Sequence, residues 1–362
     1  MNIRIAHIST AMTWRGGERQ ISYLHSELAK QGVYQLILCA KGSAMAKHCQ
    51  EHGWNYVVAK KKGSLSLPFA KAIAQSCKKE GIQMAHIHDS HAHNNALLAQ
   101  VLFGLKIPMV LSRRVDFPIS PLSAFKYNHP SIRRIICVSQ AIRHILAPAI
   151  RDKTKLEIIH SGIDLDDVPA KDAQLRKELG IADEVPLIGN IAAIAPHKDM
   201  PTFFDTATIF HKSYPQAHFV WIGEGKVEEH RAILKQRGMD AYVHLLGFRP
   251  NAKALLAALD VMLVTSETEG LGSSILDAMW LQVPIVATQA GGIIELVEEG
   301  STGLLAATKD AKGLARQLER LLNDPELKRQ LIANAREKAR QFGKERTAEL
   351  TLNVYKEMLG QR

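Results

Sequence analysis

The sequence has few cysteines and no long apolar run. Its 362 residues include four scattered cysteines, and no two of them form a C-x-x-C pair. This pattern favours reduced thiols over a disulfide-stabilised protein. No apolar segment approaches the roughly 20 residues that a membrane-spanning helix needs. The opening residues, MNIRIAHIST, lack the apolar core and cleavage site of a signal peptide. We therefore expect a soluble, cytoplasmic, globular protein.

Acidic residues are scarce in the first half of the chain. Residues 1–160 carry 22 Lys and Arg but only 8 Asp and Glu, a net charge of +14, whereas the remainder has a net charge of −4. A one-sided basic half indicates an acidic partner, such as an anionic lipid, a phosphorylated glycolipid or a nucleic acid. Nucleic acid is the weakest candidate, because this half lacks a recognition motif and interleaved aromatic residues. The triple lysine at 60–62 is either a membrane-surface contact or an ordinary solvated loop.

Short apolar segments alternate with helical patterns along the whole chain, which predicts parallel sheets with helices between the strands. In the first half we expect strands at 3–8, 34–40, 56–59, 84–87, 108–112 and 134–139, the last of these being the final strand. A segment rich in Asp, Lys and Pro, 165–180, is expected to be a linker, and the strand–helix pattern restarts at 187–191. We therefore predict two doubly wound, Rossmann-like α/β domains, 1–165 and 166–341, with a ligand cleft between them.

One stretch, VTSETEGLGSSILDAM at residues 264–279, combines a strand end, a Gly-containing turn and a helix start. Free N–H groups at a helix start bind phosphate, and small residues let a ligand approach the main chain. Glu269 lies in the turn and Asp277 lies eight positions later, which we place about two turns into the helix. This spacing suits a sugar nucleotide, whose hydroxyls lie at both ends and whose diphosphate lies between them. An ordinary strand-turn-helix with a polar turn is the alternative.

This stretch resembles the donor-binding signature of the family 4 retaining glycosyltransferases, which have the GT-B fold. The signature is a Glu, seven residues and a second Glu, and here Asp277 takes the second place. The resemblance covers nearly the whole chain, including Gly223 and Gly225 after one strand and the pair 291–292 after another. It implies two Rossmann-like domains facing across a cleft, with the last helix, 342–362, packing back on the first domain.

In the first half, the resemblance points to residues near the sugar-transfer centre. Gly16 and Gly17 match a Gly-Gly turn that lines the cleft, although a tight turn without a ligand is the alternative. His88 matches a histidine at a strand end, where a neutral imidazole would bond the donor sugar or the acceptor. Arg113 and Arg114 follow the next strand, and one of these guanidinium groups suits an acidic acceptor. The alternative is an ion pair with a neighbouring acid.

Four histidines crowd the segment around His88, at positions 86, 88, 91 and 93. Histidine is a common metal ligand. However, side chains at period-two positions share a face only while the strand lasts. We therefore expect no metal site here, and we expect His86 to be packed or paired within the sheet.

Lys198 matches the family's phosphate-binding lysine, but the arginine that normally precedes it is absent. Asn190 and small residues stand in its place. Two cations normally stabilise the developing diphosphate charge. We therefore expect Lys198 to act with backbone amides, with His197 or with Arg249. A capping loop with a surface lysine is the alternative.

The resemblance implies a metal-independent, retaining hexosyltransferase, and no Asp-x-Asp pair lies at the end of a predicted strand. The expected catalytic residues are His88, Lys198 and Glu269. The expected donor-binding residues are Gly17, Gly223, Gly225, Arg249, Glu269, Gly270, Leu271, Gly272, Ser273 and Asp277. The expected acceptor-binding residues are Gly16, Arg113 and Arg114. No cofactor is expected, and the co-substrate is a nucleotide-sugar donor, for which a UDP-sugar is favoured.

The expected acceptor is an anionic glycolipid of the lipopolysaccharide type, reached by peripheral association with the inner face of the cytoplasmic membrane. Two other functions remain open. A sugar-nucleotide 2-epimerase shares the fold and needs no acceptor. A non-catalytic nucleotide-sugar-binding protein would account for the missing arginine and for Asp277.

Overall fold

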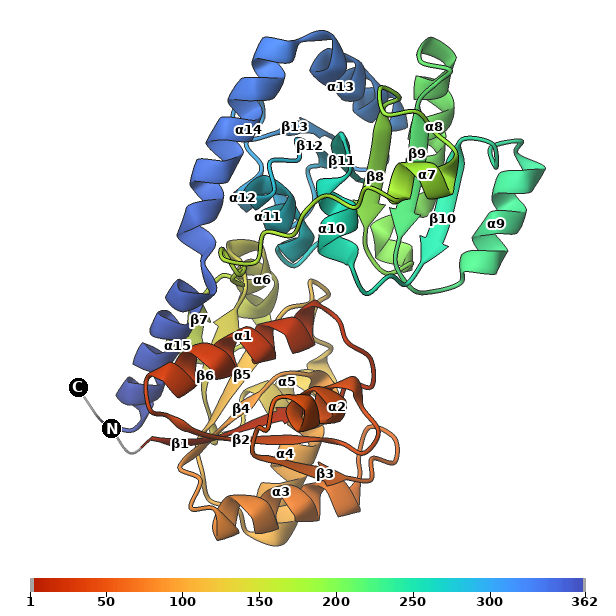
Figure 1. The fold of residues 1–362 in the computed structure, drawn as a ribbon. Coiled ribbons are helices and arrows are strands. Elements are labelled where there is room, and N and C mark those ends of the chain that lie inside the picture. Colours follow the sequence, from red (N-terminus) through yellow and green to blue (C-terminus); the bar gives the residue numbers. More distant parts are fainter. Residues whose placement is uncertain (1–2, 361–362) are drawn as a thin grey trace. The chain divides into compact units, whose positions relative to one another are not determined.

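The computed structural model describes residues 3–360. The chain divides into two compact units: unit 1 joins Met1–Gly162 to Lys344–Arg362, and unit 2 is Ile163–Gly343. The division after Gly162 lies near the boundary expected after residue 165. Each unit contains one sheet in which all strand pairs are parallel (Figure 1). The α/β class predicted from the alternating pattern is therefore confirmed.

The sheet of unit 1 has seven strands in the order β3-β2-β1-β4-β5-β6-β7. Their bounds are β1 (Arg4–Ser9), β2 (Tyr34–Ala40), β3 (Tyr56–Ala59), β4 (Met84–Ile87), β5 (Met109–Arg113), β6 (Ile132–Cys137) and β7 (Leu156–Ile158). The order reverses between β1 and β4, which pair in parallel. In sheets of this kind, ligands bind beyond the carboxyl ends of the strands at such a switch point.

Helices cover both faces of this sheet, with α1 and α15 on one face and α3 and α4 on the other (Figure 1). The helices of unit 1 are α1 (Gly16–Lys30), α2 (Ala44–Glu51), α3 (Leu67–Lys79), α4 (Ser90–Phe103), α5 (Pro121–Tyr127), α6 (Gln140–Leu146) and α15 (Lys344–Met358). One core cluster joins Ile3, directly before β1, and Ile5, within β1, to Leu28 of α1 and to Leu352 and Tyr355 of α15. The last helix is therefore an integral part of unit 1.

The sheet of unit 2 has six strands in the order β10-β9-β8-β11-β12-β13. Their bounds are β8 (Leu187–Ile191), β9 (His218–Ile222), β10 (Val243–Gly247), β11 (Val261–Val264), β12 (Ile285–Thr288) and β13 (Leu304–Ala306). Counted from the first strand of each unit, this order repeats that of the first six strands of unit 1. The switch point of unit 2 therefore lies between β8 and β11, which pair in parallel.

The helices of unit 2 are α7 (Leu175–Leu179), α8 (Met200–Ser213), α9 (Val227–Gln236), α10 (Ala252–Ala257), α11 (Ser273–Trp280), α12 (Ile293–Leu296), α13 (Ala311–Asn323) and α14 (Pro325–Ala339). The core of the unit is aromatic where α8 meets the sheet: Phe203 packs edge-on against Phe219 and Trp221. Leu314 and Leu318 of α13 join the same cluster. Leucines at this helical spacing give α13 one continuous apolar face.

Three expectations from the sequence need correction. The strand at 134–139 is not the last of unit 1, because β7 follows it and pairs with β6. Residues 165–180 are not a free linker, because this segment belongs to unit 2 and contains α7. Gly16 and Gly17, which we expected in a turn, are the first two residues of helix α1.

Within residues 3–360, no helix combines the length and the apolar character that a membrane crossing requires.

Candidate functional site

The two loops at the switch point of unit 2 are bonded to each other. The Thr265 hydroxyl, directly after β11, donates to the carbonyls of Lys198 and Asp199, both at 3.0 Å. The amide of Glu267 donates to the carbonyl of His197 at 2.8 Å. Asp199 in turn caps α8 by accepting from the amide of Thr202. The loop after β8 is therefore fixed against the loop after β11.

Lys198 and Glu269 form an ion pair at this point, through the Lys198 ammonium and Oε2 of Glu269. Each side chain is 17% exposed, so the pair is shielded but still reachable from solvent. The Ser266 hydroxyl lies 3.4 Å from the same carboxylate oxygen. The two residues that the sequence predicted to hold a diphosphate and a sugar therefore lie together at the carboxyl edge of the sheet.

The Gly-Gly pair after β12 holds the Glu269 turn in place. The amide of Gly292 donates to the carbonyl of Glu269 at 2.8 Å. A Cβ at Gly291 would overlap that carbonyl, and a Cβ at Gly292 would overlap the carbonyl of Gly270. Only glycine lets the two turns approach this closely.

Helix α11 begins at the end of the Glu269 turn. Its N-cap is Gly272, which has φ of 91° and no side chain to accept from the first helical amides. The first amides of a helix lack partners within it, so this end suits an anion. This geometry fits the predicted role of Gly270, Leu271, Gly272 and Ser273 but does not test it.

Asp277 lies closer to the start of α11 than we expected. It is the fifth residue of the helix, just over one turn in, and not two turns in as predicted. Its side chain is buried, and one of its oxygens lies 3.8 Å from the ammonium of Lys253. Lys253 also pairs with Asp167 at 2.9 Å. The sequence analysis missed Lys253, because it lies 24 positions from Asp277 in a different helix, α10.

Gly223 and Gly225 pack against the loop after β8. A Cβ at Gly223 would overlap the carbonyl of Ala192, and a Cβ at Gly225 would lie 2.7 Å from Cβ of Ile194. The amide of Ile194 donates to the carbonyl of Glu224 at 2.7 Å. Contact between the two loops is therefore enough to require both glycines, and their predicted contact with a donor remains a prediction.

Within residues 3–360, no arginine pairs with Glu269 in place of the arginine that the family normally carries. Arg249 pairs with Glu178 of α7, and its predicted role at the donor remains untested. Asn190 lies within β8, where it is 2% exposed and its amide nitrogen makes no hydrogen bond within the described residues. The side chain of His197 is exposed. The cation that the structure places against Glu269 is Lys198.

The switch point of unit 1 is also bonded across its two loops. Asp89 accepts from the amide of Thr10 at 2.5 Å and from its hydroxyl at 2.7 Å, and it also caps α4. The Lys61 ammonium donates to the carbonyl of Thr10 at 3.2 Å. One lysine of the 60–62 run is therefore turned toward this edge of the sheet and not toward open solvent.

The predicted Gly-Gly turn forms the start of α1, and Gly16 is the first residue of the helix. The Glu18 carboxylate accepts from the amide of Arg15 at 3.1 Å and so helps to cap the N-terminus of α1. A Cβ at Gly17 would meet no atom within 4 Å, and the φ of Gly17 does not require glycine. Packing within unit 1 therefore does not explain why position 17 is a glycine.

His88 directly follows β4 at the carboxyl edge and is 8% exposed. Its Nε2 lies 3.0 Å from Nδ1 of His7 in β1. Burial lowers the pKa of His88 well below its usual value, and the neighbouring His86 and the positive charge of Arg114 lower it further. His88 is therefore a neutral imidazole near pH 7, as the sequence reasoning required.

Of the four clustered histidines, the structure brings two together with His7 and separates the others. His86 bonds to Tyr355 Oη at 2.5 Å and to Ser112 Oγ at 2.8 Å, so it is paired as expected. His91 and His93 lie in α4 instead. Ligand atoms of His7, His86 and His88 lie within 4.8 Å of one another. A metal ion there would have to displace the hydrogen bonds that both nitrogens of His7 and His86 already make.

The structure distinguishes the two arginines after β5. The guanidinium of Arg113 is hydrogen-bonded within unit 1: it donates to Tyr127 Oη at 3.1 Å and to the carbonyl of Phe117 at 2.5 Å. The side chain of Arg114 lies beside His88, and its Nη2 is 3.5 Å from Nδ1 of that ring. Within residues 3–360, no carboxylate lies at ion-pair distance from Arg114. Arg114 is therefore the better candidate for contact with an acidic group.

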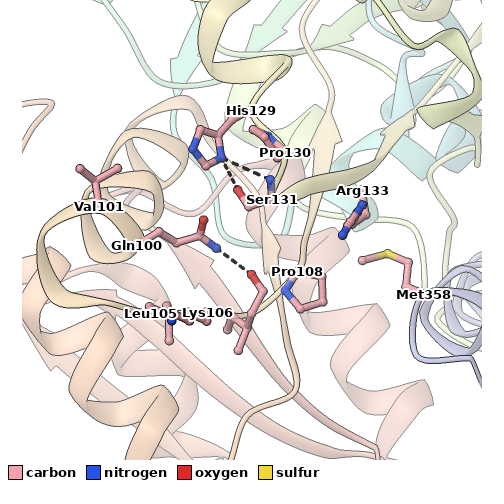
Figure 2. Close-up of a pocket in the computed structure, with 11 residues that line it drawn as sticks. Gln100, Val101, Leu105, Lys106, Pro108, His129, Pro130, Ser131, Arg133 and Met358 are labelled. Carbon is pink, nitrogen blue, oxygen red and sulfur yellow. Dashed lines mark hydrogen bonds between the residues drawn. The ribbon is translucent and has the colours of Figure 1, made fainter.

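A pocket of about 560 Å³ lies at the opposite edge of the unit 1 sheet (Figure 2). It is lined by Leu105–Pro108, which precede β5, by His129–Ser131, which precede β6, and by Met358 of α15. His129 and Ser131 bond to each other there at 2.7 Å. The pocket opens at the amino ends of the strands, so it is not part of the site at their carboxyl ends.

Two family models match the chain. Residues 14–167 match glycosyltransferase family 4, and residues 171–338 match glycosyl transferases group 1. The two matches follow the two units closely. Each covers a little under half of the chain, and together they cover most of it.

Curated relatives and solved structures agree with these matches. The chain is 28% identical to N-acetyl-alpha-D-glucosaminyl L-malate synthase of Bacillus anthracis over 81% of this chain and 79% of that protein. It is 31% identical to N,N'-diacetylbacillosaminyl-diphospho-undecaprenol alpha-1,3-N-acetylgalactosaminyltransferase of Campylobacter jejuni, over 49% of this chain and 46% of that protein. Several other curated relatives are likewise matched over about half of their length, for example 49% and 44%.

The structure of Anabaena HepE, solved with UDP and glucose, superposes with a TM-score of 0.87 at 21% identity. The match covers 98% of this chain and all of HepE. At this identity the likeness concerns the fold alone. Both halves of the sequence and both sheets thus point to one architecture: the chain belongs to the family 4 glycosyltransferases and has the GT-B fold.

Proposed function

We propose that the protein is a retaining hexosyltransferase that moves a sugar from a UDP-sugar to an anionic glycolipid. The observation that carries this proposal is the pairing of Lys198 with Glu269 at the switch point of unit 2. A lysine suits the diphosphate and a carboxylate suits sugar hydroxyls, and a sugar nucleotide places these groups next to each other. HepE, which shares the fold, was solved with UDP and glucose.

The groups around this pair suit the charge that develops during transfer. As the bond between the sugar and the diphosphate breaks, negative charge grows on the leaving diphosphate. The Lys198 ammonium and the first amides of α11 would stabilise that charge. The acceptor oxygen bonds to the same face of the sugar, and its proton passes to the leaving diphosphate. The roles of Asp277 on the ribose and of His88 at the transfer centre belong to this proposal.

Two features of unit 1 support an anionic acceptor. Arg114 is a partly buried cation beside His88, and within residues 3–360 no carboxylate lies at ion-pair distance from it. Burial lowers its pKa to about 10, against the opposing charges of Glu18 and Asp89, so it stays charged near pH 7. The net positive charge of the chain lies in residues 1–160, which have a net charge of +14 against −4 for the remainder. The Campylobacter jejuni relative is named for an acceptor that carries a lipid-linked diphosphate.

Exposed apolar side chains beside basic ones support a lipid-facing surface on unit 1. Leu65, Leu67 and Phe125 are 60%, 56% and 77% exposed. The segments that carry them both contact the first half of α4: Ser66 bonds to Asn95, and Lys126 bonds to Ser90 and Asn94. Apolar side chains flanked by lysines suit a peripheral contact with an anionic bilayer. We therefore place the acceptor at a membrane surface.

The test uses the complete protein with UDP-glucose, UDP-galactose and UDP-N-acetylglucosamine. Each donor is supplied with and without a polyprenyl-diphosphate-linked sugar in detergent. We expect UDP release that depends on the acceptor, persists in EDTA, and gives a product with the anomeric configuration of the donor by NMR. Conversion of the donor to its epimer without acceptor would overturn the proposal in favour of an epimerase. UDP binding without any transfer would favour a non-catalytic binding protein.

Membrane association is tested separately by sedimentation with vesicles of phosphatidylcholine alone or with added phosphatidylglycerol. We expect binding to the anionic vesicles only, and weaker binding for Phe125→Ser, because this side chain is 77% exposed. Leu102→Ser, at the opposite, amino-edge end of α4 and 56% exposed, serves as the control. Equal binding of the wild type to both vesicle types, or to neither, contradicts the lipid-facing surface.

A further inference from the structure

A chain of hydrogen bonds runs through the core of unit 1 and ends at His88. The Gln35 amide, in β2, donates from Nε2 to the carbonyl of His25 at 2.8 Å. Its Oε1 lies 3.0 Å from Nε2 of His7, in β1. Nδ1 of His7 then lies 3.0 Å from Nε2 of His88. Gln35 and His7 are 4% and 0% exposed, so water does not substitute for these partners.

These hydrogen bonds are consistent with only one placement of the protons on the two rings. Because the carbonyl of His25 can only accept, the Gln35 amide must present its nitrogen to it and its oxygen to His7. Nε2 of His7 must therefore carry a hydrogen. Burial lowers the pKa of His7 to about 4, so near pH 7 the ring is neutral and holds one proton. Its Nδ1 is then an acceptor, and Nε2 of His88 must donate to it.

The other side of His88 agrees with this arrangement. His88 is also neutral, so a proton on Nε2 leaves a lone pair on Nδ1. Nη2 of Arg114, which can only donate, lies 3.5 Å from that atom. This distance is at the limit of hydrogen bonding. The lone pair is therefore available for a shorter bond from another donor.

We propose that His7 and Gln35 are positioning residues that fix the tautomer of His88 and present its Nδ1 lone pair to a substrate hydroxyl. The group recognised is a hydroxyl donor, on the transferred sugar or on the acceptor. This inference rests on the proposed function, because that function places His88 at the transfer centre. His86 does not share the role, because Tyr355 and Ser112 take both of its nitrogens.

The first test measures the tautomer directly in the wild-type protein without substrate. The protein is labelled with 15N-histidine, and the signals of His88 are assigned by their loss in His88→Gln. Long-range 1H–15N spectra at pH 7 distinguish a protonated ring nitrogen from an unprotonated one. We expect His88 to be protonated at Nε2 and unprotonated at Nδ1. A His88 that is protonated at Nδ1, or that exchanges equally between the two tautomers, overturns the inference.

The second test uses Gln35→Leu, which removes the hydrogen-bond acceptor for Nε2 of His7. His7 then has no fixed partner for its Nε2 hydrogen, so both rings can change tautomer. We expect the His88 signals to shift toward a tautomer mixture and kcat to fall by roughly 10- to 100-fold, by analogy with the loss of partners that orient metal-bound histidines. The KM for the UDP-sugar should change less than about 2-fold, because Gln35 does not touch the donor.

A matched control breaks a similar bond in unit 2. Nδ1 of His218 lies 2.8 Å from Nε2 of His244, in the sheet of that unit. We expect His244→Leu to leave the His88 signals unchanged and kcat within about 2-fold of the wild type. Loss of kcat in Gln35→Leu with an unchanged His88 tautomer would reduce Gln35 to a structural role and overturn the inference. Failure of glycosyl transfer in the wild type would instead overturn the proposed function and leave the tautomer measurement intact.

Discussion

The ion pair between Lys198 and Glu269 gives the sharpest prediction, because its two members have different proposed ligands. Lys198 is assigned to the diphosphate and Glu269 to the sugar hydroxyls. In the structure, the Glu269 carboxylate pairs with the Lys198 ammonium that a diphosphate needs. Glu269→Gln should therefore release Lys198 for UDP while removing the contact with the sugar. Lys198→Met should remove the contact with UDP itself.

The magnitudes follow from burial and charge. Two unit charges about 4 Å apart attract by about 4 kcal/mol at the effective dielectric of a protein surface. Desolvation offsets much of this attraction for side chains that are each 17% exposed. We therefore expect Glu269→Gln to lower the free energy of unfolding of unit 2 by about 2 kcal/mol, or roughly 4–8 °C in Tm for a unit of this size.

The effects on binding and turnover should separate the two variants. With Lys198 released, UDP should bind Glu269→Gln as tightly as the wild type or up to about 10-fold more tightly. Turnover of the UDP-sugar should fall by roughly 100-fold, as for a group that acts in the transition state. In Lys198→Met, the loss of a charged hydrogen bond of about 1.5–3 kcal/mol should weaken UDP binding by roughly 10- to 100-fold.

Titration calorimetry with UDP and steady-state kinetics with the UDP-sugar measure both quantities. Glu298→Gln is the control, because it removes the pair with Lys338, in which the Glu298 side chain is 58% exposed. Such a pair contributes less than about 1 kcal/mol. If Glu269→Gln loses UDP binding as severely as Lys198→Met, the two residues do not act on separate parts of the ligand and the assignment is wrong.

Three further predictions concern two glycines and the pH dependence of stability. Gly292→Ala should lower Tm and turnover together, because its Cβ would overlap the carbonyl of Gly270 and displace the Glu269 turn. Gly17→Ala should leave Tm unchanged within about 2 °C, since nothing lies within 4 Å, but should raise the KM for the donor if a ligand approaches that turn. An unchanged Tm in Gly292→Ala, or an unchanged KM in Gly17→Ala, contradicts these readings. For pH, the unfolded chain protonates His7 below about 6.5 and the folded chain only near 4, so stability should be lost as pH falls through this window. The loss from His7 is at most about 3 kcal/mol. Denaturant titrations at pH 7 and pH 5 should show a smaller loss for His7→Leu, and an equal loss would refute the assignment to this residue.

The local pattern of apolar strands followed by polar residues accounts for much of what we predicted from the sequence. Lys198 and Glu269 each follow a short apolar strand, and parallel strands place such residues at one edge of a sheet. Their meeting could therefore be expected once the strands were recognised. The strand β7 was missed because it has three residues, LEI, which give too short a pattern to distinguish from a loop.

The rest of the site depends on contacts between distant segments. His7 and Gln35 are single polar residues within apolar strands, and nothing near them in the sequence marks a partner. Only the register that pairs β1 with both β2 and β4 places them beside each other and beside His88. Lys253 was missed for the same reason. Its approach to Asp277 depends on the packing of α10 against α11.

Unit 1 is assembled from two separate stretches of chain, and this has a consequence for protein synthesis. On the ribosome, residues 1–162 emerge first, but α15, which completes their core with Leu352 and Tyr355, emerges only after all of unit 2. Unit 2 is one continuous stretch and can finish folding while the N-terminal sheet still exposes the apolar face that α15 covers. The apolar face of nascent unit 1 therefore stays uncovered until the last helix arrives, and transiently exposed apolar surface of this kind is prone to aggregation.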